Sequence, residues 1–228
     1  MASHLDLEEQ EQLDQLKHFW NTYGNLITWV LIAALGAIAA MNGWQYWQRT
    51  QALKASALFE EVERAVQGGD LARAERAFQD ARDQYGRTAY AQHAGLLLAQ
   101  AATDKGKPDV ARTALSWVAE QSSDEGLQAV ARLRLVALLV EAKDFDGALK
   151  QLSAEYPTQF TALVADRRGD VLQLQGKKAE AKAEYTKAWQ GLEARAEYRR
   201  LIEVKLTALG VDPKSLEGDK AAAGSAKS

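Results

Sequence analysis

The feature that most constrains this chain is a stretch between Phe19 and Gln48 that contains no Asp, Glu, Lys or Arg. Its middle, Leu26 to Met41, is almost wholly apolar, and the aromatic residues Trp44, Tyr46 and Trp47 follow it. A helix from Leu26 to Trp47 would be about 33 Å long, against a bilayer hydrocarbon core of about 30 Å. The sequence therefore predicts one transmembrane helix over residues 23–48.

Two alternatives to a permanent membrane anchor stay open. A cleaved secretory signal needs a basic segment ahead of its apolar core and small residues at the cleavage site. Ala37 and Ala39 supply the small residues, but acidic residues outnumber Lys17 in the segment before the stretch. The second alternative is a buried core helix, which rarely runs this long without a charge. The tryptophans and tyrosines at both ends favour the anchor, because these residues gather at membrane interfaces.

The charges beside the span do not settle its orientation. Lys17 precedes the span, whereas Arg49, Lys54 and Arg64 follow it. Taken alone, the positive-inside rule would place the large C-terminal part in the cytoplasm. Long domains, however, cross membranes largely regardless of charge, so this count leaves the orientation open.

The composition of the remaining chain excludes several classes of protein. About 160 ordered residues follow the span, enough for one core. A net charge of −3 and the absence of basic runs argue against a nucleic-acid surface. The chain has no cysteine, which excludes thiol catalysis, disulfides and cysteine-based metal sites.

A repeat organises the part after the span. Turn-forming residues recur near positions 69, 106, 143 and 176, and each turn precedes a segment with small and large residues at helical spacing. The small residues that open these segments are Ala74, Ala111, Ala148 and Ala181, at intervals of 37, 37 and 33 residues. In the third copy Glu155 replaces the last small residue, so the match is imperfect there. Period and pattern resemble the tetratricopeptide repeat, a 34-residue pair of antiparallel helices, with an irregular helical bundle as the alternative.

The sequence thus predicts an all-α protein in four segments. An N-terminal segment spans residues 1–22, the transmembrane helix residues 23–48, a tetratricopeptide-like solenoid residues 49–209, and a flexible tail residues 210–228. The repeats are expected near 55–88, 92–125, 129–162 and 162–195. A last amphipathic helix, over residues 194–209, is expected to cap the solenoid and to end at Gly210.

No catalytic, cofactor-binding or metal-binding motif is visible. The three histidines, His4, His18 and His93, are too scattered for a histidine-based zinc site in the repeats. Asp166 and Asp170 lie one helical turn apart and could flank a cation, but the neighbouring arginines favour an ordinary solvated helix face. We therefore expect no enzyme activity, no cofactor and no small-molecule substrate.

One apolar row is a candidate partner-binding site. In repeats of this kind, particular positions of the first helix line the concave face, and in the third repeat all of them are apolar: Val130, Leu133, Ala137 and Val140. Exposed apolar patches usually mark a partner. The row would instead be structural if the C-terminal helix covered it, or if the assumed register slipped by one residue.

The acidic N-terminal segment, the span ending in GWQYWQ, and the repeat segments TAYAQHAGLLLAQ and GDVLQLQGKKAEAKAEYTKAW together resemble the YfgM family. These proteins are ancillary subunits of the SecYEG translocon in Gram-negative bacteria, and the resemblance covers residues 6–209. It implies a single-pass inner-membrane protein with a cytoplasmic N-terminus, periplasmic repeats, and two partners, SecYEG and the periplasmic chaperone PpiD. We expect an adaptor that helps to pass translocated proteins to chaperones. The alternative is an envelope scaffold or regulatory protein that is not tied to the translocon.

Overall fold

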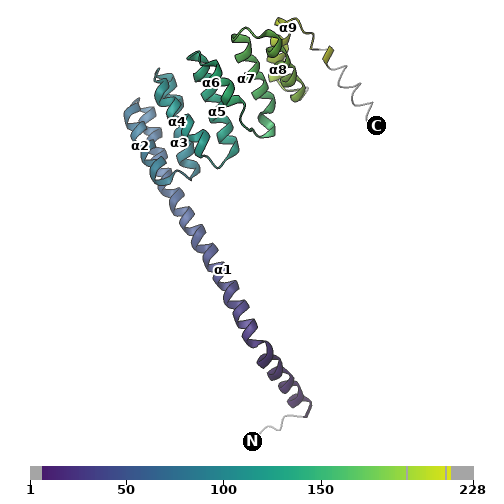
Figure 1. Ribbon diagram of the computed structural model, residues 1–228. Coiled ribbons are helices and arrows are strands. Elements are labelled where there is room, and N and C mark those ends of the chain that lie inside the picture. Colours follow the sequence, from purple (N-terminus) through teal and green to yellow (C-terminus); the bar gives the residue numbers. More distant parts are fainter. Residues whose placement is uncertain (1–6, 194, 214, 217–228) are drawn as a thin grey trace. The chain divides into compact units, whose positions relative to one another are not determined.

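The computed structural model describes residues 7–193, 195–213 and 215–216. The chain divides into two compact units, Met1–Leu53 and Lys54–Ser228. Among the described residues every regular element is helical, which confirms the predicted all-α class (Figure 1). The elements are α1 (Leu7–Gln67), α2 (Leu71–Tyr85), α3 (Ala89–Asp104), α4 (Pro108–Gln121), α5 (Glu125–Glu141), α6 (Phe145–Leu152), η1 (Thr158–Phe160), α7 (Thr161–Leu174), α8 (Lys178–Gly191) and α9 (Tyr198–Ala208).

The first unit is the N-terminal part of α1. It contains one helix long and apolar enough to cross a membrane, and only 6% of its most apolar 18-residue window is buried. Large side chains such as Leu26, Trp29 and Leu35 are more than half exposed. A soluble core helix would bury these side chains, so their exposure favours the membrane span.

The second unit is built from helix pairs. α3 pairs with α4, α5 with α6, and α7 with α8, and residues 54–67 of α1 share a core cluster with α2. Figure 1 shows these helices following one another in chain order through the unit. Successive pairs also contact each other, because α2 packs on α3 and α4 on α5. This arrangement is the predicted helical-repeat solenoid.

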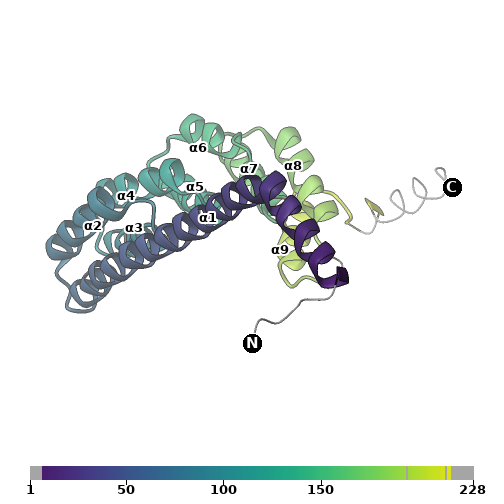
Figure 2. The same ribbon diagram turned by 90° about the horizontal axis from the view of Figure 1, so that it is seen from below.

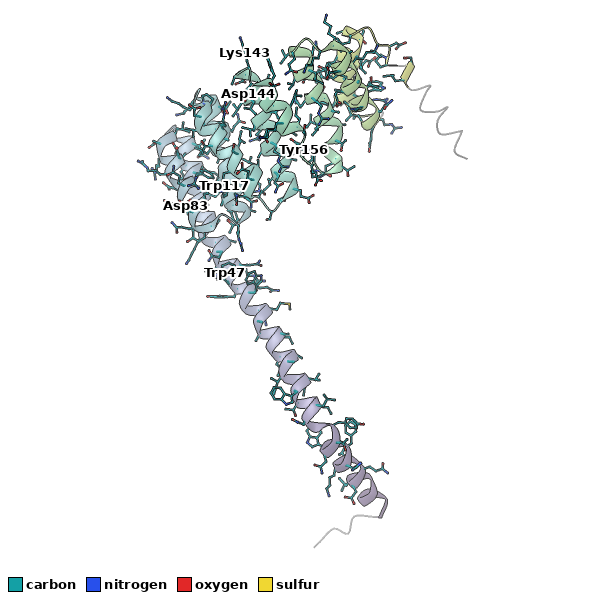
Figure 3. All side chains as sticks on the ribbon, viewed as in Figure 1. Trp47, Asp83, Trp117, Lys143, Asp144 and Tyr156 are labelled. Atoms are coloured by element: carbon teal, nitrogen blue, oxygen red, sulfur yellow. The ribbon has the colours of Figure 1, made fainter. Side chains whose placement is uncertain are left out.

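The turn inside each pair has the same backbone geometry. One residue adopts a left-handed conformation. The N–H of the residue after it donates a hydrogen bond to the carbonyl five positions before that donor, and this bond ends the first helix of the pair. Glycine takes this position in the first, second and fourth repeats. In the third repeat Lys143 takes it, with a φ of 62° (Figure 3). The left-handed residues are Gly69, Gly106, Lys143 and Gly176.

The predicted small and large positions form the core between helices. The four small residues Ala74, Ala111, Ala148 and Ala181 are all fully buried. The large residues four positions later are buried as well: Phe78, Leu115, Leu152 and Tyr185. In the fourth repeat a Cβ added to Gly169 would lie 2.6 Å from Cε1 of Tyr185, so glycine is needed where α7 and α8 cross.

The third repeat departs from the pattern, and Glu155 marks the place. Its second helix, α6, has only 8 residues, whereas α4 and α8 have 14 each. The helix ends at Leu152, and Glu155 lies exposed in the following loop. A longer helix would have to bury the residue at position 155, and a charged glutamate there is not suited to burial.

The C-terminal helix is shorter than expected and buries only part of its apolar surface. α9 starts at Tyr198 rather than near residue 194, and Gly210 follows it with φ of 74°. Ile202 and Leu206 are fully buried, but Leu201 and Val204 are exposed. Of the expected tail, Val211 and Pro213 are buried, whereas residues 214 and 217–228 lie outside the described residues.

Candidate functional site

The predicted apolar row lies along α5, the first helix of the third repeat. Val130, Leu133 and Val140 are half-buried and pack against the core of the first three repeats, and Ala137 is exposed. Each larger side chain therefore contributes to the fold on one side while part of it remains accessible. Whether a partner covers the row stays a prediction.

The C-terminal helix does not pack in the same cluster as this row. Ile202 and Leu206 of α9 belong to a second core cluster, formed with α7 and α8 around Tyr185 and Trp189. The row belongs to the first cluster, which extends from the end of α1 to α7. The packing of α9 is thus concentrated on the fourth repeat.

The first helices of the first two repeats also carry aromatic side chains. The rings of Phe59 and Tyr90 lie 6.2 Å apart, and Tyr90 is exposed. Arg134 Nη1 donates a hydrogen bond of 3.3 Å to the carbonyl of Leu96, which links α5 to α3. His93 on α3 is exposed as well. This surface offers apolar and aromatic side chains, which are suited to binding a protein segment rather than to chemistry.

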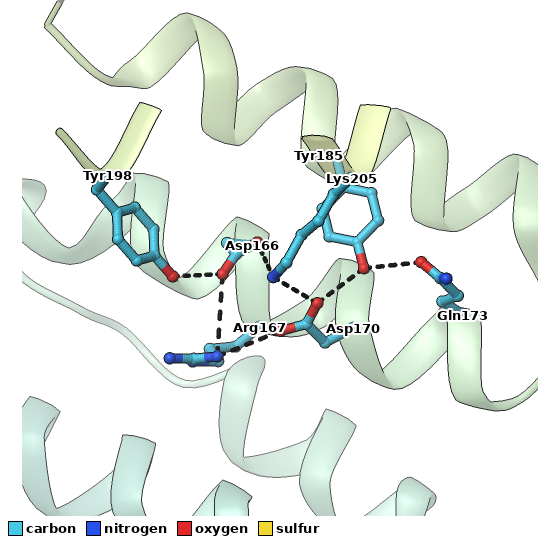
Figure 4. Close-up of polar contacts among 7 residues, drawn as sticks. All are labelled: Asp166, Arg167, Asp170, Gln173, Tyr185, Tyr198 and Lys205. Atoms are coloured by element: carbon cyan, nitrogen blue, oxygen red, sulfur yellow. Dashed lines mark hydrogen bonds and ion pairs between the residues drawn. The ribbon is translucent and has the colours of Figure 1, made fainter. Parts of the chain in front are cut away.

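The corresponding positions of the fourth repeat carry a polar cluster instead. Asp166 is fully buried, and Lys205 Nζ lies 2.6 Å from Oδ1 of both Asp166 and Asp170 (Figure 4). Tyr198 donates to Asp166 Oδ2 at 2.5 Å, and Tyr185 donates to Asp170 Oδ1 at 2.8 Å. We call Asp166, Asp170, Tyr185, Tyr198 and Lys205 the buried polar cluster.

This cluster corrects the expectation of a solvated helix face. Asp166 and Asp170 do flank a cation, but that cation is the ammonium of the chain's own Lys205. Arg167 Nη1 adds an ion pair at 3.2 Å to Asp170 Oδ2. Buried carboxylates need such partners, since an unpaired buried charge is strongly destabilising.

The two tyrosines of the cluster are held in their neutral form. Burial raises the pKa of Tyr185 far above its usual range, and the hydrogen bond to Asp170 raises it further. Burial and the hydrogen bond to Asp166 raise the pKa of Tyr198 in the same way. Both hydroxyls are therefore hydrogen-bond donors at neutral pH, and the cluster attaches α9 to the fourth repeat.

Sequence reasoning missed the roles of Tyr198 and Lys205. Both residues lie in the segment that was expected to form the last amphipathic helix, and neither was singled out there. A signal was present, because a lysine on the helix after Asp166 and Asp170 is a natural counter-ion. Lys205 lies 39 residues after Asp166 in the sequence, however, so whether the two meet depends on how α9 packs.

Metal binding has no support among the described residues, where no group of three or more His, Asp or Glu side chains is close enough to hold an ion. Of the three histidines, His4 lies outside the described residues, and His18 and His93 are both exposed.

Known proteins resemble the chain over nearly its full length. A family profile described as a tetratricopeptide repeat-like domain matches residues 17–211. A protein of Neisseria gonorrhoeae named "Ancillary SecYEG translocon subunit" is 31% identical, over 92% of this chain and 100% of its own length. Proteins with the same name from Haemophilus influenzae and Escherichia coli are each 32% identical, over 81% and 80% of this chain and over 90% and 85% of their own lengths.

These matches cover both the apolar helix and the repeats, and they agree with the helix pairs seen in the structure. The resemblance to the YfgM family is thereby confirmed, and the chain belongs to the family of ancillary SecYEG translocon subunits with a tetratricopeptide repeat-like domain.

Proposed function

We propose that this chain is a non-enzymatic adaptor of the inner membrane that acts beside the SecYEG translocon. One span, residues 23–48, anchors it with its N-terminus in the cytoplasm. The repeat domain, residues 49–209, then lies in the periplasm and helps to pass translocated proteins to periplasmic chaperones, PpiD among them. The observation that carries the proposal is the full-length match to relatives named as translocon subunits.

The membrane anchor gives this proposal a physical basis. A tether confines the repeat domain close to the membrane face, which raises its effective concentration toward any partner in the same membrane. Individually weak contacts then suffice, and a half-buried apolar row is suited to weak contacts. We propose that Val130, Leu133, Ala137 and Val140 form part of the surface that partners contact.

Capture of partners from membranes tests the function. The full chain is purified in mild detergent with a C-terminal affinity tag, and the co-purifying proteins are identified by mass spectrometry. Translocon subunits and a periplasmic chaperone are expected. If the chain brings down an envelope complex without translocon subunits, the scaffold alternative replaces the proposal.

The structure indicates which variant tests the row most cleanly. Val130 and Leu133 are half-buried, so a carboxylate at either position would disturb both the core and the surface. Ala137 is exposed, so Ala137→Asp should weaken capture while it costs the fold no more than the difference in helix propensity, about 0.7 kcal/mol. Ala179→Asp, on the exposed first turn of α8, adds the same charge away from the row. Equal capture by both variants would remove the row as a binding surface.

The absence of cysteine allows the orientation to be tested without background labelling. Lys107→Cys places a thiol on the exposed turn before α4, and Gln15→Cys places one before the span. In intact spheroplasts, a membrane-impermeant maleimide should label the first variant and spare the second. The reverse pattern would place the repeats in the cytoplasm.

A further inference from the structure

The segment of α1 ahead of the proposed span has a strongly one-sided distribution of side chains. At about 100° per residue, the large apolar residues between positions 13 and 23 fall within an arc of about 120°. Each of them is between 43% and 64% exposed in the structure. They are Leu13, Leu16, Phe19, Trp20 and Tyr23, and we call them the N-terminal apolar face.

The other side of this segment is polar. It carries Asp14, Gln15, Lys17 and His18, all exposed. Lys17 and Asp14 form an ion pair of 3.4 Å whose two side chains are 76% and 78% exposed, so their charges largely offset each other. A helix with this pattern needs a surface to cover its apolar side.

The N-terminal end of α1 also changes direction. Figure 2 shows the purple end of α1 at an angle to the rest of the helix. Two threonine hydroxyls donate back to the helix on either side of Gly24, from Thr22 to the His18 carbonyl and from Thr28 to the Gly24 carbonyl, each at 2.8 Å. Such back-bonds and a glycine are common causes of helix bending. The segment therefore need not continue along the axis of the span.

We infer that residues 13–23 lie along the bilayer surface, with the N-terminal apolar face inserted among the lipid headgroups and upper acyl chains. The inference rests on the proposal that residues 23–48 cross the membrane. The face continues directly into the span, so lipid is already present at this depth. Three of its five residues are aromatic, and tyrosine and tryptophan favour the membrane interface.

The charges indicate which lipid surface fits. Amphipathic helices that depend on anionic lipids carry an excess of Lys and Arg on their polar side. Here Lys17 is balanced by Asp14, so the apolar face itself holds the segment. Insertion should therefore occur in zwitterionic phosphatidylcholine bilayers and should not weaken as salt is raised.

Nitroxide labels on single cysteines test this in the full chain, reconstituted in phosphatidylcholine vesicles. Leu16→Cys reports on the apolar face and His18→Cys on the polar side, about 200° away around the helix. Ile38→Cys reports on the span. Collision with oxygen, which concentrates in lipid, is compared with collision with a water-soluble nickel chelate. The oxygen-to-nickel ratio should be several-fold higher at positions 16 and 38 than at position 18.

The three labels separate the possible failures. A lipid-like value at position 38 with equal, water-like values at 16 and 18 would overturn the inference and leave the span intact. Shielding of position 16 only after purified SecYEG is added would also overturn it, because the face would then bind protein. A water-like value at position 38 would refute the span itself, and the inference with it.

Discussion

The buried polar cluster gives the sharpest test of how the solenoid is closed. Lys205→Met removes the ammonium that lies 2.6 Å from both Asp166 and Asp170, and it leaves Asp166 fully buried with Tyr198 at 2.5 Å and Arg167 at 4.0 Å as its remaining partners. Removing one partner of a buried ion pair costs roughly 3–5 kcal/mol. Asp170 is partly exposed and keeps Arg167, so we expect the lower end, about 3 kcal/mol.

Lys187→Met is the matched control. Lys187 Nζ also lies 2.6 Å from a carboxylate, that of Glu184, but its side chain is 63% exposed, against 18% for Lys205. Glu184 also keeps Arg168 at 3.7 Å. Glu184 is itself buried, so the control should lose more than an exposed pair would, about 1–2 kcal/mol, but still less than Lys205→Met.

The assay is thermal unfolding of a fragment spanning residues 54–228, followed by far-ultraviolet circular dichroism. At about 2–4 °C per kcal/mol for a domain of this size, Lys205→Met should lower Tm by roughly 6–12 °C. Adding Asp166→Asn should recover part of that loss, because the buried charge is then gone. Equal losses for the two lysine variants would refute the view that burial gives the cluster its strength.

Three other outcomes follow from the fold. Lys143→Gly should raise the free energy of unfolding by about 0.5–1 kcal/mol, because relief of the left-handed strain exceeds the added chain entropy; no gain in urea midpoint would contradict this. Ala181→Trp should destabilise by about 1–3 kcal/mol or more, since Ala181 is fully buried, whereas Lys177→Trp on the exposed turn should not; equal Tm values would count against the packing. The free energy of unfolding should fall as the pH rises through about 10, because tyrosines in the unfolded chain lose their protons there while Tyr185 and Tyr198 in the folded chain keep theirs. The urea midpoint, measured as a function of pH, checks this direction, and Tyr198→Phe should make the decrease smaller.

The periodic features of this fold were visible in the sequence because each depends on local geometry. Gly176 marks the end of a helix because glycine adopts the left-handed conformation required there without steric strain. Ala181 and Tyr185 mark a helix crossing by their spacing on one face. Asp124 is of a residue type that often begins helices, and its side chain accepts a hydrogen bond of 3.0 Å from the Leu127 N–H at the start of α5.

The departures depended on packing between distant residues. The sequence showed Glu155 as a flaw in the third repeat but not that α6 would end at Leu152. Asp166 could not be recognised as buried, because its burial depends on where α9 places Tyr198 and Lys205. The row on α5 was predicted by position alone, and three of its four members turned out to share their surface with the core.

Direct binding to the translocon tests the central proposal most simply. The purified full chain is titrated against SecYEG in lipid nanodiscs, and empty nanodiscs of the same lipid serve as the control. We expect saturable binding to the nanodiscs that contain SecYEG, well above the lipid-only signal of the empty ones. A folded chain that binds both kinds of nanodisc equally would contradict the assignment of this protein as an adaptor of the translocon.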